Sequence, residues 1–158
     1  MYHHRITLPV NVRERVLPLL QARLSDAADL SAQLKQAHWN VKGREFFQLH
    51  ELFDKIHGEV ENFVDLIAER IIALGGVADG RVQTTAKDSR LGQYPLDVRG
   101  SDQHLEAVAA AIAKLGSSVR ADVDAAADAG DAATADLFTE VLRETDKQLW
   151  LVEAHLAA

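Results

Sequence analysis

Imidazole and carboxylate side chains gather between residues 38 and 69 at spacings that suit a metal site. They are two histidines and three acids: His38, His50, Asp54, Asp65 and Glu69. His50 with Asp54, and Asp65 with Glu69, lie four residues apart, so each pair would share one side of a helix, one turn apart. The chain has no cysteine, and imidazole and carboxylate ligands suit iron, manganese or zinc. On spacing alone, a metal site and an ordinary solvated helix face stay open as equal alternatives.

One helix cannot bring the two pairs together. Residues 44–74 contain no proline, and their apolar residues recur every three or four positions, which predicts a long amphipathic helix. His50 and Asp65 are fifteen residues apart, about 22 Å along a helix axis. An antiparallel copy of the helix, crossing near residues 58–61, would set the first pair of one chain against the second pair of the other. Gly58 would permit this close approach.

Three further long helices and one long connection are predicted around this helix. The expected helices run from near Asn11 or Pro18 to Trp39, from Asp102 to Ala129 after an N-cap at Ser101, and from a cap at Asp131 to about Leu156. The glycines at 75 and 76 are expected to end the helix of residues 44–74 in the left-handed conformation. Residues 77–100 are too many for an ordinary loop. A crossover of this length lets the second and third long helices of a bundle run parallel, as in ferritin-like folds.

Length and composition indicate one domain. The chain has 158 residues, 47% of them hydrophobic, enough for one core. We expect a short flexible segment at 1–10 and a single four-helix domain over 11–158. No apolar run is long enough to cross a membrane, and the N-terminus lacks the pattern of a signal peptide, so a cytoplasmic location is expected. The net charge of −7 argues against a surface that binds phosphate groups.

Several motifs resemble those of the Dps family, the miniferritins named as DNA-binding proteins from starved cells. They are QAHWNVKG, FFQLHELFDKI, DLIAERIIALGG, QYPLDVRG and the closing TADLFTEVLRETDKQLWLVEAHL, and they cover nearly the whole chain. The resemblance implies a ferritin-like bundle whose crossover carries a short helix within about 85–92, on the dimer interface. It also implies a shell of twelve subunits built from two-fold dimers. Such a shell oxidises Fe(II), preferably with hydrogen peroxide, and stores ferric oxide, which protects against oxidative damage.

The same resemblance implies roles for individual residues. The ferroxidase centre would take His38, His50 and Asp54 from one subunit, and the second acidic pair from its two-fold partner, in agreement with the distance argument. Zinc or manganese could stand in place of iron. Trp39 has an ordinary interpretation as a core aromatic, but by resemblance it lies beside the iron site as an electron donor and is not a ligand.

Three acidic residues and one further histidine could each be functional or have an ordinary structural role. Asp131, Asp136 and Glu140 could line an acidic iron-uptake pore on a three-fold axis, or could favour the positive end of a helix dipole. His104 has no second ligand pair nearby and is interpreted as a surface histidine.

The alternative function is that of a DNA-compacting stress protein, associated with the nucleoid, in which iron chemistry is secondary. The acidic charge and a tail with only His3, His4 and Arg5 make it a weak DNA binder. A bundle enzyme with a di-iron centre inside one chain typically needs two Glu-x-x-His motifs, and the sequence has none.

Overall fold

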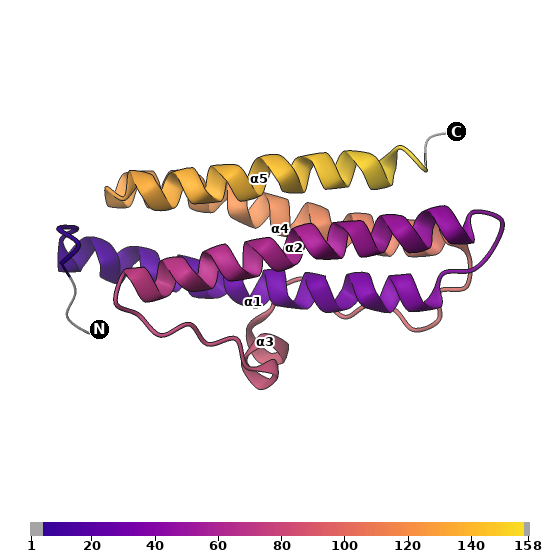
Figure 1. Ribbon diagram of the computed structural model, residues 1–158, viewed down its shortest axis with the longest axis horizontal. Helices are drawn as coiled ribbons and strands as arrows, with labels where there is room; N and C mark the ends of the chain where they lie inside the picture. Colours follow the sequence, from indigo (N-terminus) through magenta and orange to yellow (C-terminus); the bar gives the residue numbers. More distant parts are fainter. Residues whose placement is uncertain (1–4, 157–158) are drawn as a thin grey trace.

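The computed structural model describes residues 5–156, which form four long helices and one short helix and contain no strand. The helices are α1 (Val10–Asn40), α2 (Phe46–Ala73), α3 (Val82–Asp88), α4 (Ser101–Ala129) and α5 (Ala132–Glu153). Figure 1 shows α1 with α2 and α4 with α5 as two antiparallel hairpins, joined by a crossover that returns along the bundle. Because of this crossover α2 and α4 run parallel. The predicted all-α bundle with a long crossover and a short extra helix is confirmed.

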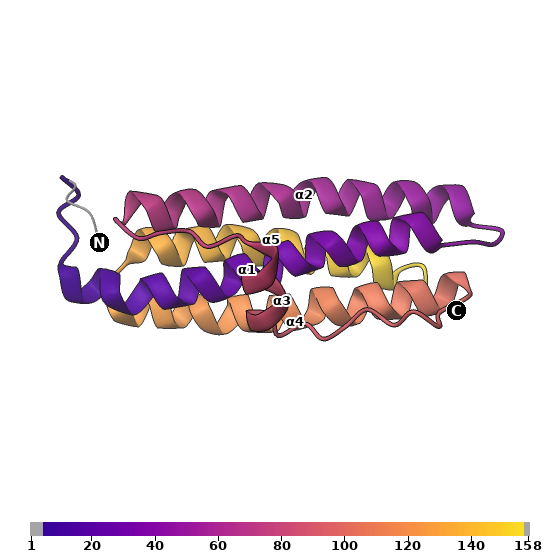
Figure 2. The same ribbon diagram turned by 90° about the horizontal axis from the view of Figure 1, so that it is seen from below.

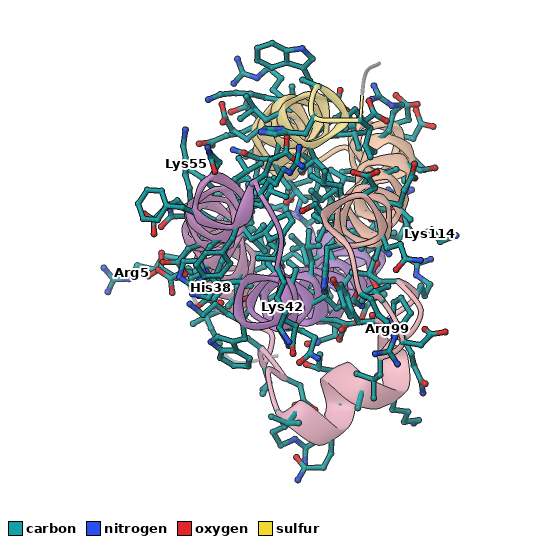
Figure 3. The ribbon with its side chains drawn as sticks, turned by 90° about the vertical axis from the view of Figure 1, so that its right-hand side faces the viewer. Arg5, His38, Lys42, Lys55, Arg99 and Lys114 are labelled. Atoms are coloured by element: carbon teal, nitrogen blue, oxygen red, sulfur yellow. The ribbon has the colours of Figure 1, made fainter. Side chains whose placement is uncertain are left out.

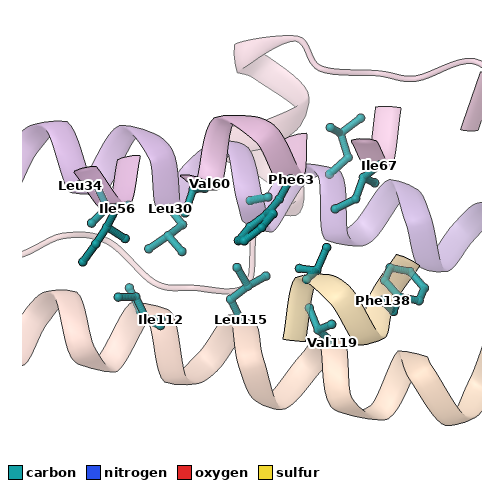
Figure 4. Packing of buried hydrophobic residues seen from close by; sticks show 14 of the residues in the cluster. Leu30, Leu34, Ile56, Val60, Phe63, Ile67, Ile112, Leu115, Val119 and Phe138 are labelled. Carbon is teal, nitrogen blue, oxygen red and sulfur yellow. The ribbon is translucent and has the colours of Figure 1, made fainter. Parts of the chain in front are cut away.

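The apolar stripe of α2 faces the interior of the bundle. Its buried residues recur every three or four positions: Leu49, Phe53, Ile56, Val60, Phe63, Ile67 and Ile71. Figure 4 shows Ile56, Val60, Phe63 and Ile67 with Leu30 and Leu34 of α1 on one side of the core, opposite Ile112, Leu115 and Val119 of α4. Phe46, which the periodicity assigns to the same stripe, is 44% exposed because it begins the helix beside the turn. With its stripe buried, α2 presents its polar residues on the outer side.

The crossover lies outside the four long helices, along α1, as the two further views show (Figures 2 and 3). Side chains of α1 hold it at successive turns through hydrogen bonds. The contacts are Gln21 with the backbone of Asp79, Asp26 with the Arg90 amide, Asp29 with the Ser89 hydroxyl, and Gln33 with the Gly92 carbonyl. The short helix has no buried residue. It ends at Asp88, earlier than the predicted 85–92, because the next two residues turn to bind α1.

Ion pairs link the interior of α1 to α4. Arg23 is 1% exposed and contacts Asp26 at 2.9 Å and Asp122 at 3.0 Å. Charges buried this deeply are stable only when they are paired. The polar side of α1 therefore fixes both the crossover and the neighbouring hairpin.

Helix ends differ from the predictions at three points. Of the two starts expected for α1, Asn11 is within one residue of the observed Val10, whereas Pro18 lies inside the helix on its exposed side. Ser101 is the first residue of α4 and not its N-cap; its hydroxyl donates to the carbonyl of Lys42 and ties α4 to the α1–α2 turn. Gly75 adopts the predicted left-handed conformation, with φ at 83°, whereas Gly76 does not. The Cβ of any other residue at 76 would lie 2.8 Å from Leu17 Cδ2, so this glycine is required for space.

Among the helices of residues 5–156, none combines the length with the continuous apolar character needed to cross a lipid bilayer.

Candidate metal centre

His38 and His50 form the centre of the candidate site. His38 is near the end of α1 and His50 is near the start of α2, and the short turn between the helices brings their rings into a stack with centroids 3.6 Å apart. The Nδ1 atom of His38 lies 2.7 Å from the carbonyl oxygen of His50, and Nδ1 of His50 lies 2.9 Å from the carbonyl oxygen of His38. A carbonyl oxygen can only accept, so each Nδ1 carries the hydrogen. Both Nε2 atoms therefore keep a lone pair, as a metal ligand requires.

Asp54, one turn beyond His50 on α2, is paired with a cation. Lys35 Nζ of α1 lies 2.5 Å from Asp54 Oδ1. This hydrogen bond and the charge of Lys35, with a contribution from His38, lower the pKa of Asp54. The carboxylate is therefore ionised at neutral pH, as a metal ligand must be. The exposure of its side chain, 48%, leaves it accessible from outside the chain.

Asp65 and Glu69 lie on the exposed side of α2, farther along the helix. The structure therefore stacks His38 on His50, places Asp54 one turn beyond His50 on α2, and leaves the second acidic pair apart from them. Within the described residues of one chain, no three metal-ligating side chains converge on one point. One subunit thus presents two separate parts of the predicted site.

Large apolar side chains are exposed near both parts of the predicted site, Trp39 and Phe47 near the histidines and Ile72 near Glu69. Trp39 is 66% exposed, so its interpretation as a core aromatic is wrong for the single chain. On α2, Phe47 is 67% exposed and Ile72 is 45% exposed. Large exposed apolar groups beside ligand-type side chains are typical of a surface that another protein covers.

A second group of polar side chains lies one step further along the seam between α1 and α2. His57 Nδ1 is 2.9 Å from Ser31 Oγ and 3.3 Å from the Ser31 carbonyl oxygen. The Ser31 hydroxyl donates to Glu61. Sequence reasoning missed this group, although His57 and Glu61 repeat the spacing of His50 and Asp54 seven residues later. It also missed Lys35, since a lysine on a helix surface gives no signal of its partner.

Asp131 of the predicted pore has structural contacts within the chain. It is 2% exposed, caps α5 through the amide of Thr134, and receives two hydrogen bonds of 2.9 Å from Arg70 Nη2. Asp136 and Glu140 are exposed on α5. A pore would therefore depend on these two carboxylates.

His104 is buried and not on the surface, which corrects the prediction. It is 1% exposed, and its Nδ1 lies 2.6 Å from the hydroxyl of Tyr94 in the crossover. Burial lowers the pKa of His104 and raises the pKa of Tyr94 to about 12, so the pair is neutral at neutral pH. The pair fixes the end of the crossover against α4.

Comparison with known proteins places this geometry in a family. Residues 17–158 match the family described as a ferritin-like domain. The chain is 39% identical over 149 residues to the DNA protection during starvation protein of Agrobacterium fabrum, an alignment that covers 94% of this chain and 92% of that protein. It is 33% identical over 141 residues to the protein of the same name from Mycolicibacterium smegmatis, with 89% of this chain and 76% of that protein covered.

Solved structures give the same result. DpsC from Streptomyces coelicolor superimposes with a TM-score of 0.94 at 30% identity, over 99% of this chain and 92% of its own. The tetragonal form of Mycobacterium smegmatis Dps also gives 0.94, at 31% identity, over 100% of this chain and 96% of its own. The bundle, its crossover and the motifs around the histidines therefore have one common explanation: the chain is a ferritin-like protein that belongs to the Dps family.

Proposed function

We propose that this protein oxidises Fe(II) at sites shared between two subunits and stores the ferric product. Dps proteins are miniferritins, a family known for iron storage, and the observation that carries the finer proposal is the stacked pair His38 and His50. Each imidazole is held by a backbone carbonyl through Nδ1, which leaves the Nε2 lone pair of each stacked ring available to a ligand. Histidines held in this way are oriented for a metal ion before it binds.

A single antiparallel arrangement of two α2 helices would match both the ligand pairs and the exposed apolar residues on the outer side of this helix. If the two-fold axis passes midway between residues 59 and 60, His50 lies level with the partner subunit's Glu69, and Asp54 with the partner's Asp65. The same arrangement sets exposed Phe47 level with the partner's Ile72 at each end of the contact. One position of the axis thus aligns both the ligand residues and the exposed apolar residues. This supports a metal site shared between two chains over the alternative of two separate groups of solvated charges.

The proposed chemistry follows from the ligand set. Neutral imidazoles bind the ferrous ion, and carboxylates stabilise the ferric ion. Because the Asp54 side chain is half-exposed, both iron and the oxidant can reach it from solvent. One hydrogen peroxide takes one electron from each of two ferrous ions, and with two protons it yields two water molecules. The resulting ferric ions hydrolyse and release protons as the oxide forms. The proposed shell of twelve subunits would hold this oxide.

The test is the rate of anaerobic Fe(II) oxidation after addition of peroxide, followed by absorbance. We expect His50→Ala and Asp65→Asn each to slow the fast phase at least about ten-fold, since each removes a ligand of every site. His155→Ala is the matched control, because His155 is exposed beyond the end of α5.

A mixture of the two variants tests whether the site is shared. Half of randomly paired dimers contain one chain of each kind, and each such dimer has one intact site and one doubly altered site. Equal mixing should therefore restore about a quarter of the wild-type fast phase. Failure of the mixture to recover, with both variants folded, would place all ligands in one chain; wild-type rates in both variants would remove the proposed site altogether.

DNA binding remains the alternative proposal. The two curated relatives described above are named for DNA protection, but the net charge of −7 opposes phosphate contacts. His3 and His4 of the predicted tail lie outside the described residues, and no contact among residues 5–156 favours this function.

A further inference from the structure

His57 is held in the same way as His50, one step along the same seam. In both residues Nδ1 faces an acceptor on α1: the His38 carbonyl for His50, and the hydroxyl and carbonyl of Ser31 for His57. The Ser31 hydroxyl donates its only hydrogen to Glu61, so toward His57 it must accept. Nδ1 of His57 therefore carries the hydrogen, and Nε2 keeps its lone pair for a ligand. The proposed ferroxidase site does not use this side chain.

Glu61 follows His57 by four residues, as Asp54 follows His50. A separation of seven residues turns an α-helix by two turns less about 20°, so the second pair repeats the first on nearly the same face. Ser31 contacts both His57 and Glu61, so the two side chains are neighbours on the outer side of the α1–α2 seam. The outer side of α2 thus carries three pairs at four-residue spacing, of which the middle pair has no assigned function.

The middle pair lies at the proposed two-fold axis. With the axis midway between residues 59 and 60, His57 is level with the partner's Asn62, only about 1.5 Å along the helix from the partner's Glu61. The two copies of the middle pair therefore face each other across the axis. Gly58, between them, has no atom within 4 Å of where its Cβ would be, so the chain leaves space at this point.

We propose that His57 and Glu61 of two chains form a metal site on the two-fold axis, between the two ferroxidase sites. Two imidazole nitrogens and two carboxylate groups suit a divalent first-row transition-metal ion, such as Zn²⁺ or Fe²⁺, in four-coordinate geometry. The site rests on the subunit pairing in the proposed function, and it holds one ion for every two chains. An ion held by both chains would also stabilise the dimer.

Cobalt(II) is a suitable probe, because its visible absorbance reports coordination geometry. Equilibrium dialysis of the assembled protein gives the number of Co²⁺ ions per chain. We expect His57→Ala and Glu61→Gln each to lose about half an equivalent per chain, together with the four-coordinate absorbance. Glu61→Gln keeps the size of the side chain and serves if His57→Ala fails to assemble. Glu59→Gln, a carboxylate on another side of α2, and His155→Ala are the matched controls and should bind as the wild type.

The outcomes separate this site from the ferroxidase proposal. His50→Ala should lose cobalt at the ferroxidase sites and keep the half equivalent on the axis. If Glu61→Gln binds as much cobalt as the wild type, Ser31, His57 and Glu61 form a hydrogen-bond network only and the inference is overturned. Loss of one full equivalent of cobalt per chain in Glu61→Gln would mean that each chain binds its own ion, and would also overturn the shared site. Unchanged iron oxidation in His50→Ala would instead refute the ferroxidase assignment.

Discussion

The carboxylate of Asp131, in the turn between α4 and α5, links α5 to α2. It caps α5 through the Thr134 amide, accepts the Thr134 hydroxyl at 2.5 Å, and binds Arg70 at the end of α2. Burial alone would raise the pKa of Asp131, but the hydrogen bonds from Thr134 and Arg70 outweigh it and lower the pKa. The carboxylate is therefore ionised in the folded protein, and its contacts stabilise the junction between the two hairpins.

Asp131→Asn should lower the free energy of unfolding by about 2–4 kcal/mol at neutral pH, since Arg70 loses its buried partner. A lowered pKa contributes stability that is complete above the unfolded value of 3.8 and is lost as the pH falls through the folded value. Urea midpoints of both proteins should thus differ by a constant amount from pH 5 to 8 and converge below about pH 4. A difference that grows on acidification would contradict this account.

Residue positions near a turn were predictable, and those that depend on the crossover were not. His38 and His50 flank a short turn, so their proximity followed from the helix boundaries. His104 was misassigned because its partner, Tyr94, belongs to the crossover. The path of the crossover cannot be predicted from the spacing of apolar residues, since most of it is not helical. Lys35 was missed because the pairing register of α1 and α2 determines its contact with Asp54.

At the scale of elements, Gly76 controls how the crossover leaves α2. Its amide donates to the Ile71 carbonyl at 2.9 Å, and an added Cβ would lie 2.8 Å from Leu17 Cδ2 and 2.9 Å from Ile71 Cγ2. Ile71 lies in the core and the partly buried Leu17 packs against it, which limits how far either side chain can move. The end of α2 is therefore fixed by packing against α1 as well as by the conformation of Gly75.

Gly76→Ala should destabilise the fold by about 1–3 kcal/mol through overpacking. Gly80→Ala is the matched control, because no atom lies within 4 Å of its Cβ position. Urea denaturation of the two variants provides the comparison. Equal midpoints would show that Leu17 and Ile71 give way without strain.

The elements themselves were largely predictable. Apolar periodicity indicated all four long helices, and Asp131 caps α5 as predicted, directly after Gly130 ends α4 in the left-handed conformation. The start of α1 was ambiguous because an exposed proline can lie within a helix. The short helix was displaced because contacts with α1, which local sequence does not contain, determine where it ends.

At the scale of the whole molecule, the outer side of α2 is incomplete in one chain. Exposed Phe47 and Ile72, the separated ligand pairs and the empty space at Gly58 all lie on it. The sequence predicted the need for a second copy by distance alone, since a helix of known rise separates its own ligands. Only the folded chain showed which of these side chains α1 already holds.

Gly58→Ala provides the sharpest test of that pairing. Within the chain the new methyl group meets nothing, and alanine favours a helix by up to about 1 kcal/mol, so the isolated subunit should not lose stability. Against a twin helix the same methyl group should weaken the assembly. Sedimentation at decreasing protein concentration measures the strength of the assembly. Ser117→Ala, at an exposed position of α4, is the control for helix propensity. Assembly as tight as that of the wild type would exclude close packing at Gly58.

The attachment of the crossover to α1 also has a consequence for how the chain opens. Each hairpin is joined by a short turn, whereas the crossover is held mainly by side chains of α1 and contributes no buried residue from its helix. Its amides should exchange with solvent long before those of α2 or α4. A cut within the crossover would leave two hairpins that still share a core. The packing between the two hairpins, and not the crossover, therefore holds the molecule together.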